Sequence, residues 1–453
     1  MPSLRPSYFL LRSCRCLVLT FGTLAAAAPA VAQIGLPGLP QLPGAGLPSR
    51  LGESVSLPRE RLRGRLLDVS DLPRSVASLD QLRLVTVRDL LARHPAQLEP
   101  DPRGFPVVRR EILAWSPSPA GLTAAAAAGL IVVSRHELPE AGQTLVTLRA
   151  PEGAATANVL DALRKADPDG VYDFNHVYVG AGADAGAAGV PAPIGAPRDT
   201  AHTAAGELRV GLIDSGVNER HEVFDNARIA RWGCDGATRP APHGTAVAAL
   251  MIGKSDRFTG AAPGAKLYAA DIYCDQPTGG SASQIVQALS WLAREQVGVI
   301  NISLVGPPNQ MLGKSVQAMV ARGHLLVAAV GNDGPAAPPL YPASYPGVVG
   351  VTGVDPKRNP LPEAARGPQV MFAAPGSQLV VAAIGTPPYK LARGTSFAAP
   401  VVAALLAIEL QAPSPSLAAQ AISALAARAL PAGDGTGRGV VGERLRNAPS
   451  NFR

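Results

Sequence analysis

The sequence lacks any run of basic residues interleaved with aromatic side chains. Lys and Arg outnumber Asp and Glu by 41 to 34, and the resulting formal charge of +7 is spread along the chain. Because nucleic-acid binding depends on clustered positive charge, this distribution argues against a nucleic-acid partner. Long internal repeats are also absent. The length of 453 residues allows two or three domains, and the apolar fraction of 47% is ample for a buried core.

A long apolar run is missing as well. The apolar stretch at residues 17–28 is shorter than the roughly 20 residues that a spanning helix needs. It follows three arginines and precedes the small residues at 30–32, a pattern typical of an export signal. We therefore interpret residues 1–32 as a signal peptide, the alternative being a membrane anchor. We expect an exported protein, periplasmic or secreted, with no stable membrane anchor.

Cysteine is scarce, with four residues in all. Cys14 and Cys16 lie in the predicted signal peptide, which leaves Cys234 and Cys274 in the mature protein. An exported protein can join these two in one disulfide, whose loop of about 40 residues would stabilise the fold by roughly 3 to 4 kcal/mol. The alternative is two separate buried thiols.

Two stretches poor in large side chains divide the chain. Residues 33–50 are rich in Pro and Gly and are interpreted as a linker. Residues 181–203 contain mostly Gly, Ala and Pro, which cannot bury enough surface to order themselves, and are interpreted as a flexible linker and processing region. The segment between them, 51–180, forms an N-terminal region, and no chemistry can be assigned to residues 51–115.

Residues 122–179 show the clearest pattern of the N-terminal region. An alanine-rich helix is followed by strands at 130–134 and 144–148, a helix at 156–165 and a strand at 171–179. This order predicts a small α+β domain of the ferredoxin-like kind.

After residue 204 the hydrophobicity pattern changes to one of apolar strands that alternate with helices. The expected strands lie at residues 208–213, 267–273, 297–304, 325–330 and 348–354, and the expected helices at 244–251, 282–296 and 311–322. Nearly continuous apolar strands are typical of parallel strands buried on both faces. Residues 204–453 are therefore predicted to form a doubly wound α/β parallel sheet, with its site at the carboxyl ends of the strands.

Four polar residues stand where this architecture would place a site. Asp214 ends the first strand, His243 lies in a turn that enters a helix, Asn332 follows a buried strand, and Ser396 precedes an apolar helix. Taken singly, each has an ordinary interpretation as a helix cap or a turn residue. A neutral Ser hydroxyl is a poor nucleophile, so a catalytic Ser396 requires a base such as His243 and an acid such as Asp214.

The motifs around these residues strengthen the catalytic interpretation. They read VGLIDSGV, HGTAVA, INISLVG, AAVGNDG, YPASYPGVVGVTGVD and GTSFAAP, and they present Asp, His and Ser in that order. In this order and in these motifs the chain resembles the subtilisin-like serine proteases (subtilases, peptidase family S8) from residue 208 to about residue 425.

The resemblance implies a role for each of the four residues. Asp214, His243 and Ser396 would form the catalytic triad of an endopeptidase that works through an acyl-enzyme. Asn332 would donate to the oxyanion, supported by Thr395.

The resemblance also implies a substrate-binding strand that pairs with an extended peptide. The residues that would line the substrate site are Ser303, Leu304, Val305, Ala329, Val330, Gly331 and Leu340. Val305 and Leu340 stand where the family usually has Gly, which suggests a shallow pocket for small side chains before the scissile bond. The Tyr341-Pro342 bond matches a place where the family has a cis proline.

The N-terminal α+β domain then resembles an inhibitory propeptide of an autoprocessed precursor, the alternative being a permanent accessory domain. We expect peptide substrates, no required cofactor, no metal at the catalytic site and a monomer. No carboxylate and carbonyl cluster for structural calcium is recognisable in the sequence, so such an ion stays open.

Two other functions fit parts of the sequence. The alternative is a catalytically silent binding or scaffold protein with the subtilase fold, which the presence of all four chemical residues disfavours. A nucleotide-binding protein fits the alternating pattern, yet Ala185 stands where the dinucleotide fingerprint needs Gly and Ala248 where a phosphate loop needs one.

Overall fold

The computed structural model describes residues 79–180, 207–447 and 449–452. They lie in one compact unit that runs from Arg65 to Arg453. The predicted signal peptide, the linker at 33–50 and the processing region at 181–203 fall outside the described residues.

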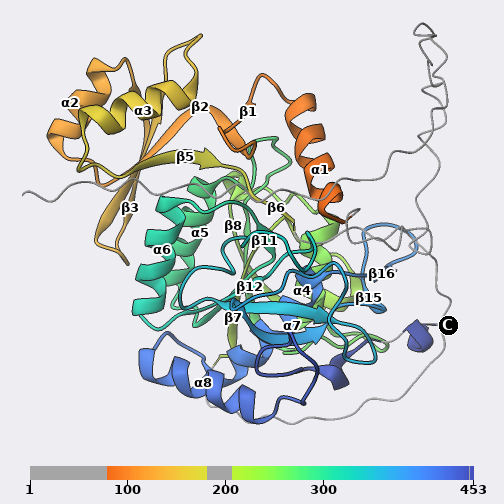
Figure 1. The fold of residues 1–453 in the computed structure, drawn as a ribbon. Coiled ribbons are helices and arrows are strands. Elements are labelled where there is room, and N and C mark those ends of the chain that lie inside the picture. Colours follow the sequence, from red (N-terminus) through yellow and green to blue (C-terminus); the bar gives the residue numbers. More distant parts are fainter. Residues whose placement is uncertain (1–78, 181–206, 448, 453) are drawn as a thin grey trace, which may run out of the picture. The chain divides into compact units, whose positions relative to one another are not determined.

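Seven parallel strands form the central sheet, in the order β14-β13-β12-β10-β7-β9-β8 (Figure 1). Strands that follow β7 in the chain lie on both sides of it, so the strand order reverses there. In open α/β sheets the crevice at the carboxyl end of such a reversal is the usual ligand site. The strands are β7 (Arg209–Asp214), β8 (Arg228–Trp232), β9 (Lys266–Asp271), β10 (Val299–Ile302), β12 (Leu325–Ala329), β13 (Val349–Val354) and β14 (Val370–Pro375).

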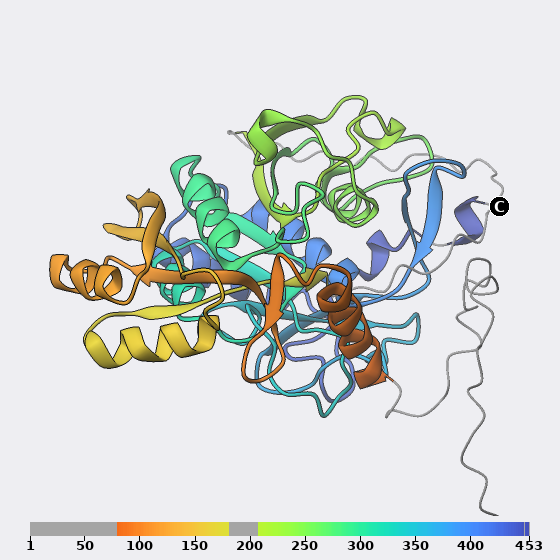
Figure 2. The same ribbon diagram turned by 90° about the horizontal axis from the view of Figure 1, so that it is seen from above.

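Helices cover both faces of this sheet (Figures 1 and 2). Neighbouring strand residues point to opposite faces, so Leu212 packs in the core with α4 and α7, whereas Ile213 packs in the core with α5 and α6. The helices are α4 (Pro242–Ile252), α5 (Ala282–Arg294), α6 (Gln310–Ala321), α7 (Thr395–Glu409) and α8 (Pro415–Ala427). The predicted doubly wound α/β fold is confirmed.

Two differences from the predicted strands concern the sheet. The expected strand at 297–304 divides into β10 and a short β11 (Leu304–Val305) that leaves the sheet and pairs elsewhere. Four further strands were not predicted, namely β8, β14 and the hairpin of β15 (Leu379–Ala382) and β16 (Tyr389–Ala392). The edge strand β8 was missed because its arginines point outward, which makes its sequence look like a loop.

The N-terminal domain has an antiparallel sheet in the order β5-β2-β4-β3, with β1 also paired to β2. With α2 and α3 this gives the β-α-β-β-α-β order of a ferredoxin-like fold. The elements are α1 (Leu79–Arg93), β1 (Leu98–Pro100), β2 (Pro106–Trp115), α2 (Pro119–Ala127), β3 (Ile131–Leu138), β4 (Gln143–Arg149), α3 (Thr156–Ala166), β5 (Tyr172–His176) and β6 (Val179–Gly180).

This domain starts earlier than the pattern at 122–179 suggested, because β2 is its central strand. The sequence hides β2, since Arg110 has a positive φ of 65° and the pairing register shifts between Val107 and Ile112. A bulge of this kind interrupts the alternation of apolar and polar residues. The strand expected at 171–179 is also two strands, β5 and β6, with different partners.

No helix among the described residues has both the length and the apolar character needed to cross a membrane.

Candidate active site

Asp214 and His243 form a hydrogen-bonded pair at the carboxyl edge of the sheet. Asp214 is the last residue of β7 and is 1% exposed. His243 is the second residue of α4, and its Nδ1 lies 2.8 Å from Oδ1 and 3.0 Å from Oδ2 of Asp214. Because a carboxylate only accepts hydrogen bonds, Nδ1 carries the proton. Nε2 is thereby left as the basic nitrogen of the ring.

Ser215 holds this pair in place, a role that was not predicted from the sequence. Its backbone N–H and its hydroxyl donate to Asp214 Oδ1 at 2.7 Å and 3.1 Å. Its Oγ also accepts from the backbone N–H of Gly244 at 3.0 Å, which ties the end of β7 to the start of α4. A Cβ at position 244 would lie 2.0 Å from the Ser215 carbonyl oxygen, so only glycine permits this approach.

Ser396 lies in the first turn of α7 and is fully buried. The ring of the next residue, Phe397, lies 5.6 Å from the His243 ring, which places this turn against the imidazole. The Ser396 carbonyl accepts from the Ser303 hydroxyl at 3.0 Å. Within the described part of the chain the Ser396 Oγ has no hydrogen-bond partner. Free backbone N–H groups and the positive end of the helix dipole favour a developing anion at this point.

Asn332 follows β12 and faces the same turn. Its Oδ1 accepts from the Thr395 backbone N–H at 3.1 Å, and the Thr395 Oγ accepts from the Gly331 N–H at 3.3 Å. Among residues that the structure describes, the Asn332 Nδ2 is buried without a partner. Since a buried donor without an acceptor costs about 1–3 kcal/mol, this amide suits a ligand oxygen.

β6, which ends the N-terminal domain of the same chain, lies against β11, the predicted substrate-binding strand. β6 pairs antiparallel with it, and Gly180 is opposite Leu304 while Val179 is opposite Val305. A Cβ built on Gly180 would lie 3.8 Å from the His243 Nε2. An extended peptide segment therefore reaches the imidazole along β11.

The remaining residues predicted to bind substrate lie around Gly331. A Cβ there would be 2.7 Å from Leu340 Cδ1 and 3.6 Å from Val305 Cγ1, so both side chains stand over this backbone. Ala329 and Val330 point into the two cores, which leaves only their backbone for a peptide. The predicted cis Tyr341-Pro342 bond is present.

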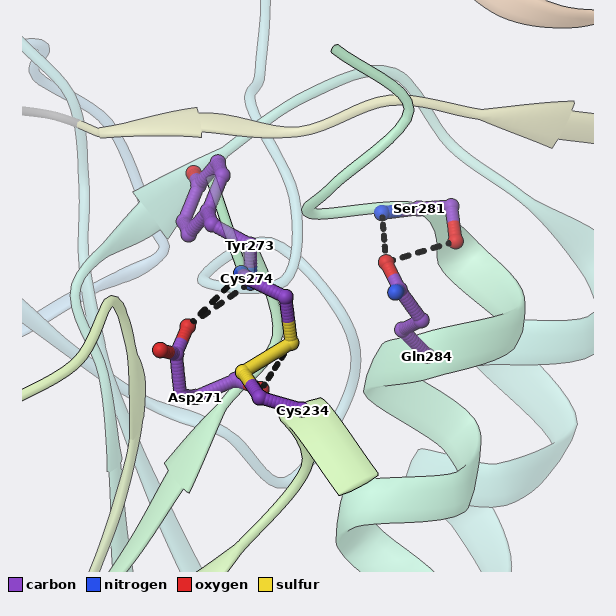
Figure 3. The surroundings of a disulfide bond; sticks show 6 residues. All are labelled: Cys234, Asp271, Tyr273, Cys274, Ser281 and Gln284. Carbon is purple, nitrogen blue, oxygen red and sulfur yellow. Dashed lines mark hydrogen bonds between the residues drawn. A yellow bond between two sulfur atoms is a disulfide. The ribbon is translucent and has the colours of Figure 1, made fainter. Parts of the chain in front are cut away.

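The predicted disulfide between Cys234 and Cys274 is present (Figure 3). The bond joins the loop after β8 to the turn after β9, in which Asp271 Oδ1 accepts from the backbone N–H groups of Tyr273 and Cys274, both at 3.0 Å. Asp271 is the strand neighbour of Asp214. Burial raises the pKa of Asp271 against the effect of these two N–H groups, and the charges of Asp275 and Asp214 raise it further.

Comparison with known proteins identifies relatives of the larger domain. A family model described as "Subtilase family" matches residues 206–442. Subtilisin DY of Bacillus licheniformis is 31% identical over 245 residues, which are 52% of this chain and 88% of that protein. Subtilisin-like protease 1 of Trichophyton rubrum is 36% identical over 228 residues, 47% of this chain and 44% of its own length. The chain thus spans less than half of this second relative.

A solved structure supports the fold. Fervidolysin from Fervidobacterium pennivorans, a keratinolytic enzyme related to subtilisin, superposes with a TM-score of 0.60 at 19% identity. The match covers 75% of this chain and 61% of that one.

Asp271 provides a pH test of the site's electrostatics. Its raised pKa means that the folded protein binds this proton more tightly than the unfolded chain, whose carboxyl keeps the ordinary value of 3.8. Wild-type stability therefore falls as pH rises through the window from 3.8 up to the raised value, and the loss persists above it. Asp271→Asn keeps the acceptor oxygen and removes this loss.

We expect the melting temperature of Asp271→Asn to exceed that of the wild type near neutral pH, with the difference shrinking toward about pH 4. Thermal unfolding measured across this range checks it. Asp235→Asn, an exposed change in the residue next to Cys234, is the matched control for the removal of one carboxylate. A difference for Asp271→Asn that is constant with pH would contradict the prediction.

Proposed function

This chain belongs to the subtilase family, and from that membership we propose that it is an exported serine endopeptidase that is made as a precursor and processes itself. The observation that carries the proposal is the hydrogen-bonded pair of Asp214 and His243 beside the first turn of α7, where the Ser396 hydroxyl has no hydrogen-bond partner among the described residues.

In the proposed reaction Ser396 Oγ attacks the carbonyl carbon of the scissile peptide bond. His243 Nε2 takes the hydroxyl proton and then gives it to the leaving amine, so that an acyl-enzyme forms as the C–N bond breaks. Water attacks the ester in the same way and releases the acid, which restores Ser396. Asp214 keeps the Nδ1 proton in place and stabilises the imidazolium.

The negative charge of each tetrahedral intermediate needs donors that are already in position. We assign this role to the Asn332 Nδ2 and the Ser396 backbone N–H. The Thr395 N–H donates a hydrogen bond to the Asn332 Oδ1 and so orients this side chain.

We assign substrate binding to β11. A peptide that extends the sheet as a strand gains backbone hydrogen bonds, and side-chain pockets then add selectivity. The chain's own β6 already makes this pairing and ends beside His243. We propose that the bonds soon after Gly180 are those cut during maturation.

For the residue just before the scissile bond we propose a shallow pocket. Leu340 and Val305 are 3% and 2% exposed and stand over the backbone of Gly331. Small side chains such as Ala, Val or Thr fit such a space, and an aromatic ring does not.

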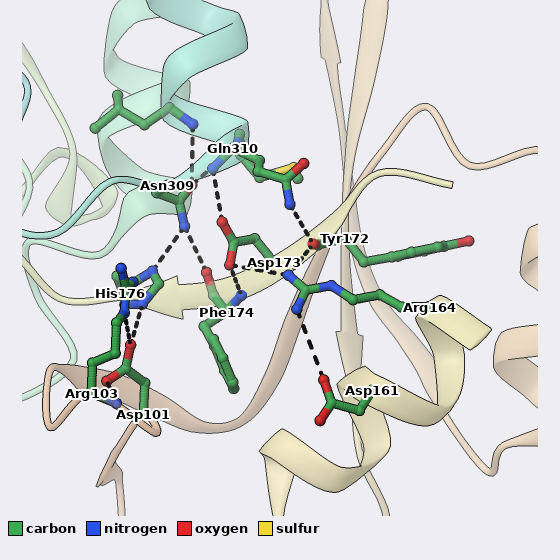
Figure 4. A network of polar contacts seen from close by, with 12 residues as sticks. Asp101, Arg103, Asp161, Arg164, Tyr172, Asp173, Phe174, His176, Asn309 and Gln310 are labelled. Atoms are coloured by element: carbon green, nitrogen blue, oxygen red, sulfur yellow. Dashed lines mark hydrogen bonds and ion pairs between the residues drawn. The ribbon is translucent and has the colours of Figure 1, made fainter. Parts of the chain in front are cut away.

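We further propose that the N-terminal domain inhibits the enzyme until it is removed. Figure 4 shows the polar contacts that hold it. Asp173 Oδ2 accepts from the backbone N–H of Gln310 at 2.8 Å, at the positive end of α6. Asn309, which caps this helix, donates through Nδ2 to the Phe174 carbonyl at 2.9 Å and to His176 Nδ1 at 3.0 Å.

Apolar packing supports the same proposal. Leu113, Leu138 and Leu145 from one face of the N-terminal sheet share a core with α5 and α6. Burying this face holds the domain in position while β6 covers β11.

Export rests on the signal-like pattern of residues 1–32 and on a relative named Minor extracellular protease Epr of Bacillus subtilis, 29% identical over 205 residues. This chain spans 32% of that relative. We propose a periplasmic or secreted monomer that acts on peptide or protein substrates.

Self-processing can be tested through the N-terminus of the purified protein. We expect the wild type to accumulate as a chain that begins after Gly180, whereas Ser396→Ala keeps residues 79–180 attached because its nucleophile is missing. N-terminal sequencing of both proteins measures this. Ser423→Ala, an exposed change in α8, should process like the wild type. Equal processing of Ser396→Ala would contradict self-cleavage.

The donor role of Asn332 predicts a loss in kcat rather than in KM. Asn332→Ala should lower kcat by on the order of a hundred to a thousand, a magnitude known for subtilisin rather than derived from this chain. Asn332→Asp keeps the oxygen that accepts from Thr395 but removes the donor, so it should lose at least as much. Steady-state kinetics on a peptide ester decide this, and full activity of the Asp variant would show that the amide only supports the turn.

The shallow pocket predicts a change of selectivity when it is opened. In Leu340→Gly the ratio of kcat/KM for a substrate with Phe before the scissile bond to that for Ala should rise by roughly 10 to 200-fold. The Ala substrate serves as the internal control, because its cleavage shows that the variant is folded. A wild type that cuts after Phe as well as after Ala would contradict the shallow pocket.

A further inference from the structure

A short segment between β13 and β14 holds the loop that carries Asn332. The backbone N–H of Ala365 donates to the Gly331 carbonyl at 3.0 Å. The carbonyl of Glu363 accepts from the Gly334 N–H at 2.8 Å. These hydrogen bonds lie before and after the proposed oxyanion donor in the chain, so the segment fixes the backbone of this loop on both sides of it.

The side chain of Glu363 binds a second part of the site, the turn that leads to Ser396. Arg393 donates to it through two contacts, from Nε to Oε1 at 2.6 Å and from Nη2 to Oε2 at 2.8 Å. Arg393 directly follows β16 and lies three residues before Ser396. An ion pair with two parallel contacts fixes a direction as well as a distance, which a single contact does not.

This ion pair is partly shielded from water. The Glu363 side chain is 12% exposed and the Arg393 side chain 33%. A charged pair in such a place is screened less than one on the open surface, and its geometry is better defined. Glu363 therefore joins the Asn332 loop through its backbone to the Ser396 turn through its carboxylate.

The direct contacts between these two loops both involve Thr395. Its N–H donates to Asn332 Oδ1 at 3.1 Å, and its Oγ1 accepts from the Gly331 N–H at 3.3 Å. An oxyanion donor must lie within a few tenths of an ångström of its proper place, and a misplacement of about 1 Å can cost about a hundredfold in rate. A second connection between the loops is valuable for this reason.

From these contacts we propose that Glu363 and Arg393 are positioning residues that set the place of the Asn332 amide relative to the Ser396 hydroxyl. The inference rests on the proposed peptidase function. Its distinguishing consequence is that the ion pair acts on the rate through Asn332. A pair that only stabilised the fold would act independently of that amide.

The test compares the rates at which four full chains process themselves: the wild type, Glu363→Gln, Asn332→Ala and the double variant. The substrate is part of the chain, so the rate reports the chemical step rather than substrate binding. Thermal unfolding of each chain, with Ser396→Ala added to keep it intact, sets a temperature at which all are folded. Glu409→Gln is the matched control, since Glu409 pairs with Arg428 at the other end of α7.

We expect Glu363→Gln to slow self-processing about tenfold, because one carboxylate oxygen becomes an N–H₂ group that faces an Arg393 donor. Asn332→Ala should slow it on the order of a hundred to a thousandfold. The double variant should lie within about twofold of Asn332→Ala, because the donor whose place Glu363 sets is already gone. Glu409→Gln should match the wild type.

Arg393→Lys is a second variant of the pair, and it decides the question if Glu363→Gln does not fold. Lysine keeps the positive charge but not the planar fork that makes two parallel contacts. We expect it to slow self-processing about fivefold, and to have little effect when Asn332→Ala is also present.

An equal loss with and without the Asn332 amide would show that the pair only stabilises the fold, and would overturn the inference. Self-processing of Glu363→Gln and Arg393→Lys at the wild-type rate would overturn it too, while leaving the proposed peptidase function intact. Failure of the wild type to process itself would instead contradict the proposed function and this inference with it.

Discussion

The buried carboxylate of Asp214 is the constraint on which the rest of the site depends. A charge that is 1% exposed costs several kcal/mol unless its oxygens are satisfied. Ser215 and His243 supply the donors, and both must therefore stand at the carboxyl end of β7. This requirement places the start of α4 beside the strand, an approach that only glycine at position 244 allows.

Two buried polar groups without hydrogen-bond partners also lie at this edge of the sheet, and each is energetically unfavourable by itself. The Asn332 amide is buried with an unused donor, and the Ser396 hydroxyl is buried without a partner among the described residues. The Thr395 N–H holds the Asn332 side-chain oxygen, and the Ser303 hydroxyl holds the Ser396 backbone carbonyl. Rigid placement of unsatisfied groups around one point is what electrostatic catalysis requires.

Much of this arrangement was predictable from local sequence. Asp214 ends an apolar strand, Asn332 follows one, and His243 and Ser396 each lie at the start of an apolar helix, so their positions at the carboxyl edge follow from the alternation of strands and helices. Tyr273 and Asp271 were not predictable in this way. Asp271 lies beside Asp214 only because β9 pairs with β7, and Tyr273 meets Tyr178 only because β6 leaves its own domain to pair with β11.

The sequence by itself determined the doubly wound α/β fold, because the periodicity of strands and helices is a local property, and its ordered motifs indicated the chemical types at the site. Only the tertiary structure decided that β2 is the central strand of the N-terminal domain, where a bulge interrupts the local pattern. It also decided that this domain contacts the N-terminus of α6 and that Tyr178 is buried beside β11. These contacts join segments far apart in the chain, and their hydrogen bonds depend on which surfaces meet after folding.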